Sequence, residues 1–440
     1  MKMHEVMSKF NEQIEKFSDQ KDVFCKRPGR DFSRSRKQSF QDTILTILSL
    51  NGGSLRNEIL KKYRYSADSP SAPAFIQQRS KLSDDAMPFL FRSLNEEMND
   101  MRLYEGYRLI AVDGSHIHVP NNPHDVDSFV QNRPDEHFHN EFHLNVFWDI
   151  LQGTFVDAVV QKYRTQNEDQ ALIEMAERND SHNSLVICDR GYESYNNIAH
   201  LQEAEWKYLI RIKDKGGRGI ADGLDFPDDN EFDMELDLYL TRKKDKQTKP
   251  LLENRNMYRW IPSGMKMDYL PLSRRSEPAK FFRLRFRIVR IRVSDELYEV
   301  LLTNLDAEEF PPHKLGELYR MRWGVETSFR NLKYAVGMLA FHSRKSEFVM
   351  QEIYAGLIIH NMTAVVSMCV TIPEKERKYE YRISFSLAAC ITKSLIAGDA
   401  SSPAAELLIL RNLIPLRPSR KYQRKKTPLK ASIQFIYRIA

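Results

Sequence analysis

The second quarter of the chain carries strand and helix signals in an order that few folds accommodate. Residues 107–119 are rich in aliphatic and β-branched side chains, and residues 142–161 indicate two further strands joined by a turn. A helix is predicted from about Asn167, whose side chain can cap it, with Gln170 three residues on. Residues 185–188 then form a short apolar strand. We therefore expect a mixed α/β core in which a strand and a hairpin precede a helix and another strand.

Two acidic residues fall where such a core positions ligands. Asp113 lies within the first strand, and Asp189 directly follows the last one. An acid just beyond a buried strand lies at the carboxyl edge of the sheet. Each acid alone is a weak signal, because acids at strand ends are common. The order strand with Asp, hairpin, helix, strand with Asp is that of an RNase H-like core.

A third carboxylate lies on a single predicted helix further along the chain. At roughly 100° per residue, five polar residues of this helix share a stripe about 80° wide. They are Tyr319, Arg322, Glu326, Arg330 and Lys333. A second, apolar stripe lies about a quarter-turn round and is expected to face a core. It consists of Leu318, Met321, Val325 and Leu332. One carboxylate among groups that bind phosphate or stack on bases predicts a metal ion held against a nucleic-acid backbone. The alternative is an amphipathic helix with a solvated polar face.

These residue types suit the cleavage and rejoining of phosphodiester bonds. Two divalent ions about 3.5–4 Å apart can activate the attacking oxygen and stabilise the leaving oxygen. Mg²⁺ prefers carboxylate, phosphate and water oxygens, and three acids without a cysteine suit Mg²⁺ or Mn²⁺ better than zinc. Arg322 can bind a phosphate through two N–H groups, whereas Lys333 provides a point charge. We expect two Mg²⁺ ions, for which Mn²⁺ can substitute.

The spacing Tyr-x2-Arg-x3-Glu-x6-Lys of residues 319–333 resembles the signature of the insertion-sequence-four family of bacterial DDE transposases, and every position is filled. The runs around Asp189 and Asn304 also look like motifs of that family. The resemblance implies an RNase H-like catalytic core with an inserted β-strand domain between the second Asp and the Glu. It also implies that Asp113, Asp189 and Glu326 are catalytic and hold the metal ions.

The same resemblance implies further DNA contacts. Arg211 and Lys213 match a basic strand motif that contacts DNA near the cut. Family members that form a DNA hairpin hold a flipped base with an aromatic residue of the insertion. Here no Trp stands just ahead of Leu-Leu-Thr, and Tyr298 is the nearest aromatic residue. The implied partners are double-stranded DNA, both the terminal inverted repeats of a transposon and its target, and a second copy of the chain in a synaptic dimer.

We therefore expect a transposase that cleaves insertion-sequence ends and transfers the strands to a target by cut-and-paste transposition. Two alternatives stay open. Six histidines lie close together in the sequence: His116, His118, His124, His137, His139 and His143. His116 and His118 project from one face of a strand, which is a metal-ligand geometry, so a histidine-dependent metal hydrolase that also uses Asp113 and Asp189 is the first alternative. The second is a catalytically dead DNA-binding regulator derived from a transposase, against which the intact acid triad argues.

Composition agrees with an enzyme that acts on a polyanion in a reducing compartment. The net charge of +6 is a mild bias toward nucleic acid, and the four cysteines are scattered without a CxxC pair. The N-terminus lacks the apolar region of a signal peptide. Residues 355–372 are the most apolar stretch, but they contain His360 and Asn361, so we expect a buried helix and not a membrane span. These features favour a cytoplasmic protein, and the resemblance implies that it is bacterial and associated with the nucleoid.

Both ends of the chain carry basic runs. Residues 26–37 hold six basic groups against one acid, and short helices are predicted to follow at 40–50, after Ser54 and after Ser83. Such a region resembles a small DNA-binding domain; the alternative is a helical subdomain that only packs on the core. Residues 417–430 carry seven basic groups and no acid, which is typical of a solvated tail or of a backbone contact in a DNA enzyme.

The segment between Asp189 and Glu326 contains strands of its own. Residues 232–240 alternate apolar and mostly acidic side chains, and residues 282–287 alternate apolar and basic ones, so the two are expected to pair. The alternation shifts phase at residues 288–289, which predicts a bulge or a strand break. We expect five regions: a helical N-terminal DNA-binding domain (1–95), the first part of the core (96–205), an inserted β domain (206–310), the second part of the core with the signature helix (311–372) and a helical, basic C-terminal region (373–440).

Overall fold

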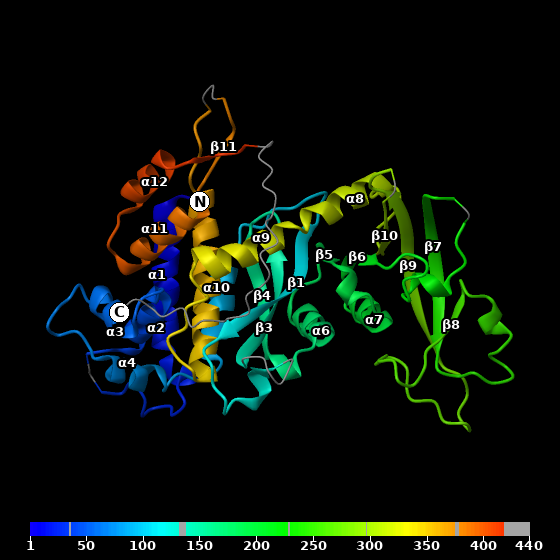
Figure 1. The fold of residues 1–440 in the computed structure, drawn as a ribbon, viewed down its shortest axis with the longest axis horizontal. Helices are drawn as coiled ribbons and strands as arrows, with labels where there is room; N and C mark the ends of the chain where they lie inside the picture. Colours follow the sequence, from blue (N-terminus) through cyan, green and yellow to red (C-terminus); the bar gives the residue numbers. More distant parts are fainter. Residues whose placement is uncertain (35–36, 132–137, 228, 296, 375–377, 418–440) are drawn as a thin grey trace.

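A large central β-sheet organises the protein (Figure 1). The computed structural model describes residues 1–440 except 35–36, 132–137, 228, 296, 375–377 and 418–440. Within those residues the fold is mixed α/β, and ten strands form one sheet in the order β2-β3-β1-β5-β6-β10-β9-β7-β8, with β4 also paired to β3. The strands are β1 Arg108–Val119, β2 Phe129–Val130, β3 His139–Asp149, β4 Thr154–Lys162, β5 Ser184–Cys188, β6 Lys207–Ile212, β7 Phe232–Thr241, β8 Tyr258–Trp260, β9 Phe281–Arg292 and β10 Tyr298–Thr303.

Helices cover both faces and one end of this sheet (Figure 1). They are α1 Met3–Asp19, α2 Phe40–Ser49, α3 Leu55–Lys62, α4 Ala72–Arg79, α5 Ala86–Glu97, α6 Glu168–Arg178, α7 Tyr195–Glu203, α8 Pro312–Met321, α9 Gly324–Arg330, α10 Ser346–Met368, α11 Phe385–Ala397 and α12 Ser402–Arg411. A π-helical turn, Asn331–Ala335, follows α9, and a small second sheet pairs β11 Tyr381–Arg382 with β12 Ile414–Pro415.

The central strands confirm the order expected from the sequence. Strand β1 pairs antiparallel with β3, which pairs antiparallel with β4, whereas β5 is parallel to both β1 and β6. Asn167 caps α6, because its side chain accepts a hydrogen bond from the backbone N–H of Gln170. The side chains of β1 alternate between the two faces: Ile110 and Val112 pack toward α6 and α7, and Ala111 packs toward α9 and α10.

The strands of the predicted insertion continue the central sheet. Strand β10 pairs with β6, then β9 with β10 and β7 with β9, so one hydrogen-bonded sheet extends from the core to the far edge. The expected charge pairing between β7 and β9 is confirmed: Arg283 contacts Asp237, and Arg287 Nε lies 2.6 Å from Asp233 Oδ1. Opposite charges across neighbouring strands stabilise this pairing. The boundaries of the five regions remain a prediction.

The predicted bulge at residues 288–289 is wrong. Throughout Phe281–Arg292, all of which the structure describes, β9 pairs with β7 or β10 without a shift of register. The apolar phase changes because both faces become covered there. Ile288 packs into the cluster on the α7 face, whereas Val289 and Ile291 pack with Leu315 of α8 on the other face. A strand that is buried on both faces loses the alternation that one-sided burial produces.

The N-terminal helices share one hydrophobic core with α10 and α11. Phe10 of α1, Ile44 of α2 and Leu90 of α5 belong to the same buried cluster as Ile358 of α10 and Ile391 of α11. Helices α2 and α3 lie close to their predicted positions, and Ser54 caps α3. The N-cap of α5 is Asp85 and not Ser83 as predicted. The backbone N–H of Ser83 instead donates to the carbonyl oxygen of Phe24 in a bridge between loops.

The predicted buried helix in the most apolar stretch is confirmed as α10, whose middle turns are buried on all sides. Within the described residues, none of the helices combines the length and apolar character needed to cross a bilayer. Helices α11 and α12 follow, as expected of a helical C-terminal region. The basic run 417–430 lies outside the described residues apart from Arg417, so its predicted DNA contact stays a prediction.

The single helix expected around residues 319–333 is wrong in one respect, because it is broken. Helix α8 ends at Met321, α9 begins at Gly324, and the π-helical turn carries Lys333. Helix α8 packs on β9 and β6, whereas α9 packs on β1. Gly324 lies so close to Trp148 that a Cβ atom there would approach the indole to 2.4 Å. Three of the four residues of the apolar stripe, Leu318, Val325 and Leu332, are buried as expected.

Candidate active site

The three predicted acids come together from β1, the end of β5 and α9. Ala111 of β1 stands opposite Ile187 of β5 in a parallel pair, and Asp113 and Asp189 each lie two residues beyond that pair. Since side chains alternate along strands, both carboxylates belong to the same face. Helix α9 packs on β1 and carries Glu326 in its first turn. The electrostatic environment of Asp113 includes the charges of both Asp189 and Glu326, as expected for neighbouring groups.

Arg322 links two of these carboxylates. Its Nη1 lies 3.8 Å from Asp113 Oδ2, and its Nη2 lies 3.7 Å from Glu326 Oε1. The side chain is buried, and its Nε–H has no hydrogen-bond partner among the described residues. A buried donor without a partner is costly, so this N–H is available to an acceptor brought by a ligand. The predicted Arg322 is thus part of the carboxylate site, close to both acids.

The charges around Asp113 suit a bound cation. Burial raises the pKa of Asp113 to about 6; Arg322 and the backbone N–H of Gly114 oppose this rise, and the charges of Asp189 and Glu326 add to it. A divalent ion would relieve the repulsion among the three acids. Their ligand atoms are all carboxylate oxygens, which suit Mg²⁺ or Mn²⁺. The residues present therefore fit a divalent metal ion.

Tyr319 is buried behind Arg322 and does not present its ring to solvent. The guanidinium carbons of Arg322 and Arg211 lie 5.6 and 6.0 Å from the centre of its ring. Arg211 projects from β6 and also approaches Glu299 at 3.6 Å. In this arrangement Tyr319 supports two arginines, whereas a role in stacking on a displaced base would require its ring to become exposed.

Lys333 is anchored to the strand that carries Asp113. Its Nζ donates a hydrogen bond of 2.7 Å to Oγ of Ser115, which lies two residues beyond Asp113 on the same face of β1. Burial lowers the pKa of Lys333, and Glu141 opposes this effect. Arg330 is exposed on α9. The polar stripe is therefore divided into a buried part around Arg322 and a more accessible part around Glu326 and Arg330.

Tyr298 lies further along the sheet, at the start of β10. The guanidinium carbon of Arg290 stands 4.1 Å above its ring, and Arg290 also bonds to Asp214. Its ring face is thus already occupied by a cation from the same chain. Lys213 follows β6, and its backbone N–H donates to Glu193. Both predicted DNA contacts remain predictions.

The histidines of β1 and β3 lie on the face of the sheet opposite Asp113. His116 and His118 are separated from Asp113 by odd numbers of residues along an unbroken strand pairing. Their cross-strand partners, His143 and Glu141, share their face. A hydrolase that combines these histidines with Asp113 is therefore disfavoured by the geometry. His137 lies outside the described residues, and His124 is exposed in a loop.

Glu168, at the first position of α6, is a neighbour of the site that the sequence analysis did not identify. Its Oε1 lies 2.9 Å from Nε2 of His143, and this contact, against the effect of burial, lowers the pKa of Glu168. Its carboxylate also approaches the backbone at Gly114 and Gly191, next to both predicted catalytic Asp residues. Any Cβ at Gly114 would lie 2.5 Å from His143, so glycine is required for this close approach. The only feature of the sequence that could have pointed to Glu168 was the predicted helix cap at Asn167, one residue before it.

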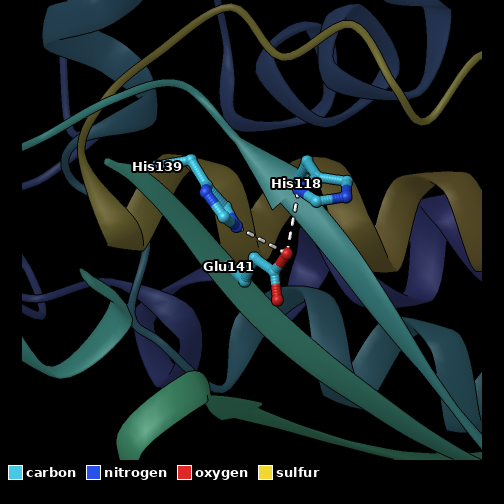
Figure 2. A group of neighbouring side chains, drawn as sticks. All are labelled: His118, His139 and Glu141. Carbon is cyan, nitrogen blue, oxygen red and sulfur yellow. Dashed lines mark hydrogen bonds and ion pairs between the residues drawn. The ribbon is translucent and has the colours of Figure 1, made fainter. Parts of the chain in front are cut away.

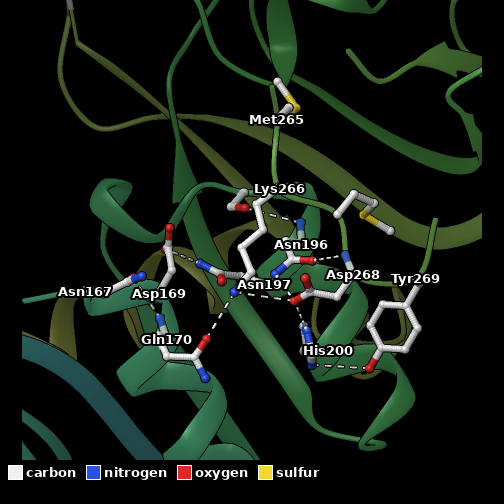
Figure 3. A network of polar contacts seen from close by, with 12 residues as sticks. Asn167, Asp169, Gln170, Asn196, Asn197, His200, Met265, Lys266, Asp268 and Tyr269 are labelled. Atoms are coloured by element: carbon white, nitrogen blue, oxygen red, sulfur yellow. Dashed lines mark hydrogen bonds and ion pairs between the residues drawn. The ribbon is translucent and has the colours of Figure 1, made fainter. Parts of the chain in front are cut away.

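A basic cleft of about 830 Å³ lies beside the first turn of α6. It is lined by seven basic and three acidic residues and by three aromatic ones, including Trp260, which is 39% exposed. One wall is the loop 261–270, which is fastened to the core helices (Figure 3). Asp268 bonds to Asn196 and to His200 of α7, and Lys266 donates to Gln170 of α6. The network holds the cleft wall against the core.

Comparisons with known proteins find relatives among transposases of insertion sequences. The chain is 25% identical over 180 residues to the transposase InsG for insertion sequence element IS4 of Escherichia coli (strain K12), covering 38% of this chain and 40% of the relative. It is 26% identical over 184 residues to the transposase for insertion sequence element IS421 of Escherichia coli, covering 40% and 48%. The chain thus matches less than half the length of these relatives.

Among solved structures, a cryo-EM structure of a piggyBac transposase synaptic complex with hairpin DNA aligns with 97% of this chain and 88% of its own, at 11% identity and a TM-score of 0.40. The transposase DDE domain family matches residues 104–362, which include Asp113, Asp189 and Glu326 and make up more than half of the sequence. The protein therefore belongs to the family of DDE transposases.

Proposed function

We propose that this protein cleaves the ends of an insertion sequence and joins them to target DNA, using an RNase H-like core. The strand order β4-β3-β1-β5-β6, with the first three strands antiparallel and the last three parallel, supports that assignment. The single observation that carries the proposal is the gathering of Asp113, Asp189 and Glu326 around Arg322 within the matched family region.

The chain's own residues divide the work of phosphoryl transfer. Asp113, Asp189 and Glu326 would hold divalent ions, Mg²⁺ or Mn²⁺, which supply charge stabilisation and an activated oxygen nucleophile when bound. Arg322 has a buried N–H without a partner and can donate it to a phosphate oxygen. Lys333, held by Ser115, places a positive charge beside the strand that carries Asp113. Positioning of the phosphate between these groups is the main contribution of the protein.

DNA would follow the basic cleft next to this site. Glu193 and Asp169 line the cleft, and they lie four residues after Asp189 and one residue after Glu168 respectively. Lys244 stands 5.0 Å from the ring of Trp260, so the two offer a cation and an aromatic face together. Basic grooves with accessible aromatic residues bind nucleic acid through backbone charge and base stacking. This supports single-stranded or distorted DNA near the cut as the occupant.

The direct test is cleavage of DNA carrying the ends of the element, with Mg²⁺, by Asp113→Asn, Asp189→Asn and Glu326→Gln variants. Each should abolish cleavage and leave DNA binding largely intact, because loss of one ligand disrupts a two-ion site. Asp295→Asn is a matched control, since its carboxylate is fully exposed in the turn between β9 and β10. Normal cleavage by any of the three variants would remove that residue from the site, and normal cleavage by all three would refute the proposal.

The DNA that flanks the reading frame offers an independent check. A cut-and-paste transposase should be bracketed by imperfect inverted repeats and short direct repeats. The repeats would also supply the substrate for the cleavage assay. A synaptic dimer should then appear on mixing the protein with paired ends, and size measurement with and without that DNA would reveal it.

A further inference from the structure

A second cluster of metal-binding side chains lies on the opposite face of the sheet from the three acids. His118 of β1 stands directly opposite Glu141 of β3, and His139 lies two residues before Glu141 on the same strand. One ligand atom from each of the three side chains lies within 4.8 Å of the others. Strand pairing alone brings these three groups together, so the arrangement is fixed by the sheet and not by a loop.

The two imidazoles converge on one carboxylate oxygen (Figure 2). His118 Nδ1 lies 3.0 Å and His139 Nε2 lies 2.8 Å from Glu141 Oε1. Glu141 is only 7% exposed, and its ion-pair contacts within the described residues are all to histidines. A buried carboxylate is costly unless its charge is compensated, and a dication bound by the same three side chains would compensate it.

We propose that His118, His139 and Glu141 bind a transition-metal dication of the Zn²⁺ class at a site separate from the three catalytic acids. Two imidazole nitrogens and one carboxylate oxygen form a three-ligand set known for Zn²⁺, with a fourth position left for water or another ligand. The side chain of His118 is 48% exposed, so that position opens to solvent. Imidazole ligands favour zinc, cobalt or nickel over Mg²⁺.

A further histidine, His116, lies close enough to supply the fourth ligand in place of water. His116 Nδ1 lies 3.3 Å from the other oxygen of Glu141, and its ring packs edge-on against His143. A bound ion would tie β1, which carries Asp113, to the beginning of β3. The expected consequence is mechanical: the ion strengthens the pairing of these strands and raises the thermal stability of the protein.

The test uses the full chain after treatment with a chelator, with Co²⁺ as a visible probe and Zn²⁺ as the competitor. Wild-type protein should bind one Co²⁺ at this site with the absorption bands of a site of low coordination number, and Zn²⁺ should displace it while excess Mg²⁺ should not. His139→Ala and Glu141→Gln should weaken binding by more than the roughly 10–100-fold typical of losing an outer-shell partner. The exposed His182, replaced by Ala, is the matched control and should change nothing.

Two further variants distinguish this site from the catalytic acids and from a loss of folding. His118→Ala removes a half-exposed ligand, so it decides the question if a substitution at a buried ligand unfolds the protein. The triple variant Asp113→Asn, Asp189→Asn, Glu326→Gln should keep the Co²⁺ site. Binding that disappears in the triple variant but persists in His118→Ala and His139→Ala would overturn the proposal. The proposal would also be overturned if wild-type protein bound Co²⁺ no more tightly than the His139→Ala variant does. The three side chains would then form only a hydrogen-bonded cluster that holds no metal.

Discussion

Arg322 occupies a position in the carboxylate site that a metal ion would also favour. It lies 3.8 Å from Asp113 and 3.7 Å from Glu326, and it opposes the rise in the pKa of Asp113 that burial causes. The guanidinium therefore has two relationships to the reaction. It competes with divalent ions for the carboxylates, and it can donate its free N–H to a phosphate. These relationships predict opposite effects on metal affinity and on DNA processing.

Replacing Arg322 with Ala should tighten Mn²⁺ binding several-fold and slow DNA processing, because a competing cation and a phosphate donor are lost together. Calorimetric titration with Mn²⁺ measures the first effect, and gel assays on intact and pre-nicked ends measure the second. Arg322→Lys is the matched variant, since it keeps the charge but loses the planar fork. Parallel losses of Mn²⁺ affinity and processing in Arg322→Ala would show that Arg322 only maintains the fold of the site.

The sequence predicts three acids that the structure brings together, but it does not predict what surrounds them. Asp113 and Asp189 were recognisable because strands and their ends leave clear patterns. Glu168 was not, because its approach to Gly114 depends on where α6 meets the sheet. The burial of Tyr319 was equally hidden: a helical stripe gives direction round one helix, whereas burial depends on what packs against it.

Among the helices and strands, the predictions were wrong where a second element packs on a face that would be exposed in the first element alone. The predicted bulge in β9 failed because α8 buries the other face of that strand. The predicted signature helix is interrupted between Met321 and Gly324, where α8 on β9 and β6 gives way to α9 on β1. The N-terminal region was predicted to be helical, but α1 itself was not placed, although Val6, Phe10 and Ile14 recur at helical spacing and are buried. The acid–base pairing of β7 with β9 succeeded because it depends only on two neighbouring strands.

A buried ion network joins the N-terminal helices to α10. Arg79 of α4 bonds to Glu352 of α10, and His342 lies between Glu352 and Glu58 at 3.0 and 3.1 Å. Burial lowers the pKa of His342, but the two carboxylates outweigh this effect and raise its pKa above the usual value. A raised pKa in the folded state means that folding favours protonated His342.

Stability from His342 should therefore be fully present below its unfolded pKa of about 6.5 and should be lost as pH rises through the higher folded value. This loss can be measured by thermal unfolding between about pH 6 and pH 9, a range that spans the titration of a histidine. His342→Gln should remove that part of the pH dependence and lower the stability below pH 6.5, about the pKa of free histidine. His313→Gln, at an exposed position, is the control. An unchanged pH profile in His342→Gln would show that this histidine is not charged in the folded protein.

At the scale of the whole molecule, the N-terminal helices and the sheet extension serve different purposes. Helices α1, α2 and α5 contribute to the core around α10, so removing them would expose that helix. A truncation could not separate DNA recognition from folding. The extension of the sheet carries the basic cleft, whose wall is fastened to α6 and α7. DNA contacts are therefore best located by substituting single exposed lysine and arginine residues.

Replacing Lys244, Lys249 and Arg255 together with Ala should weaken DNA binding and reduce its salt dependence. These side chains are exposed in the cleft, and each phosphate contact contributes about 0.9 to the slope of log affinity against log salt on duplex DNA, or about 0.7 on a single strand. If all three contact phosphate, the slope should fall by about 2–3.

Arg30→Ala with Arg34→Ala, in the N-terminal basic run, gives the comparison at another exposed surface. A larger loss of slope in the N-terminal variant than in the cleft variant would move the main DNA path from the sheet extension to the helical end of the molecule. Competition between cognate and random duplexes then distinguishes the two surfaces further. Loss of a phosphate contact lowers the affinity for both kinds of duplex, whereas loss of a base contact lowers only the preference for cognate ends.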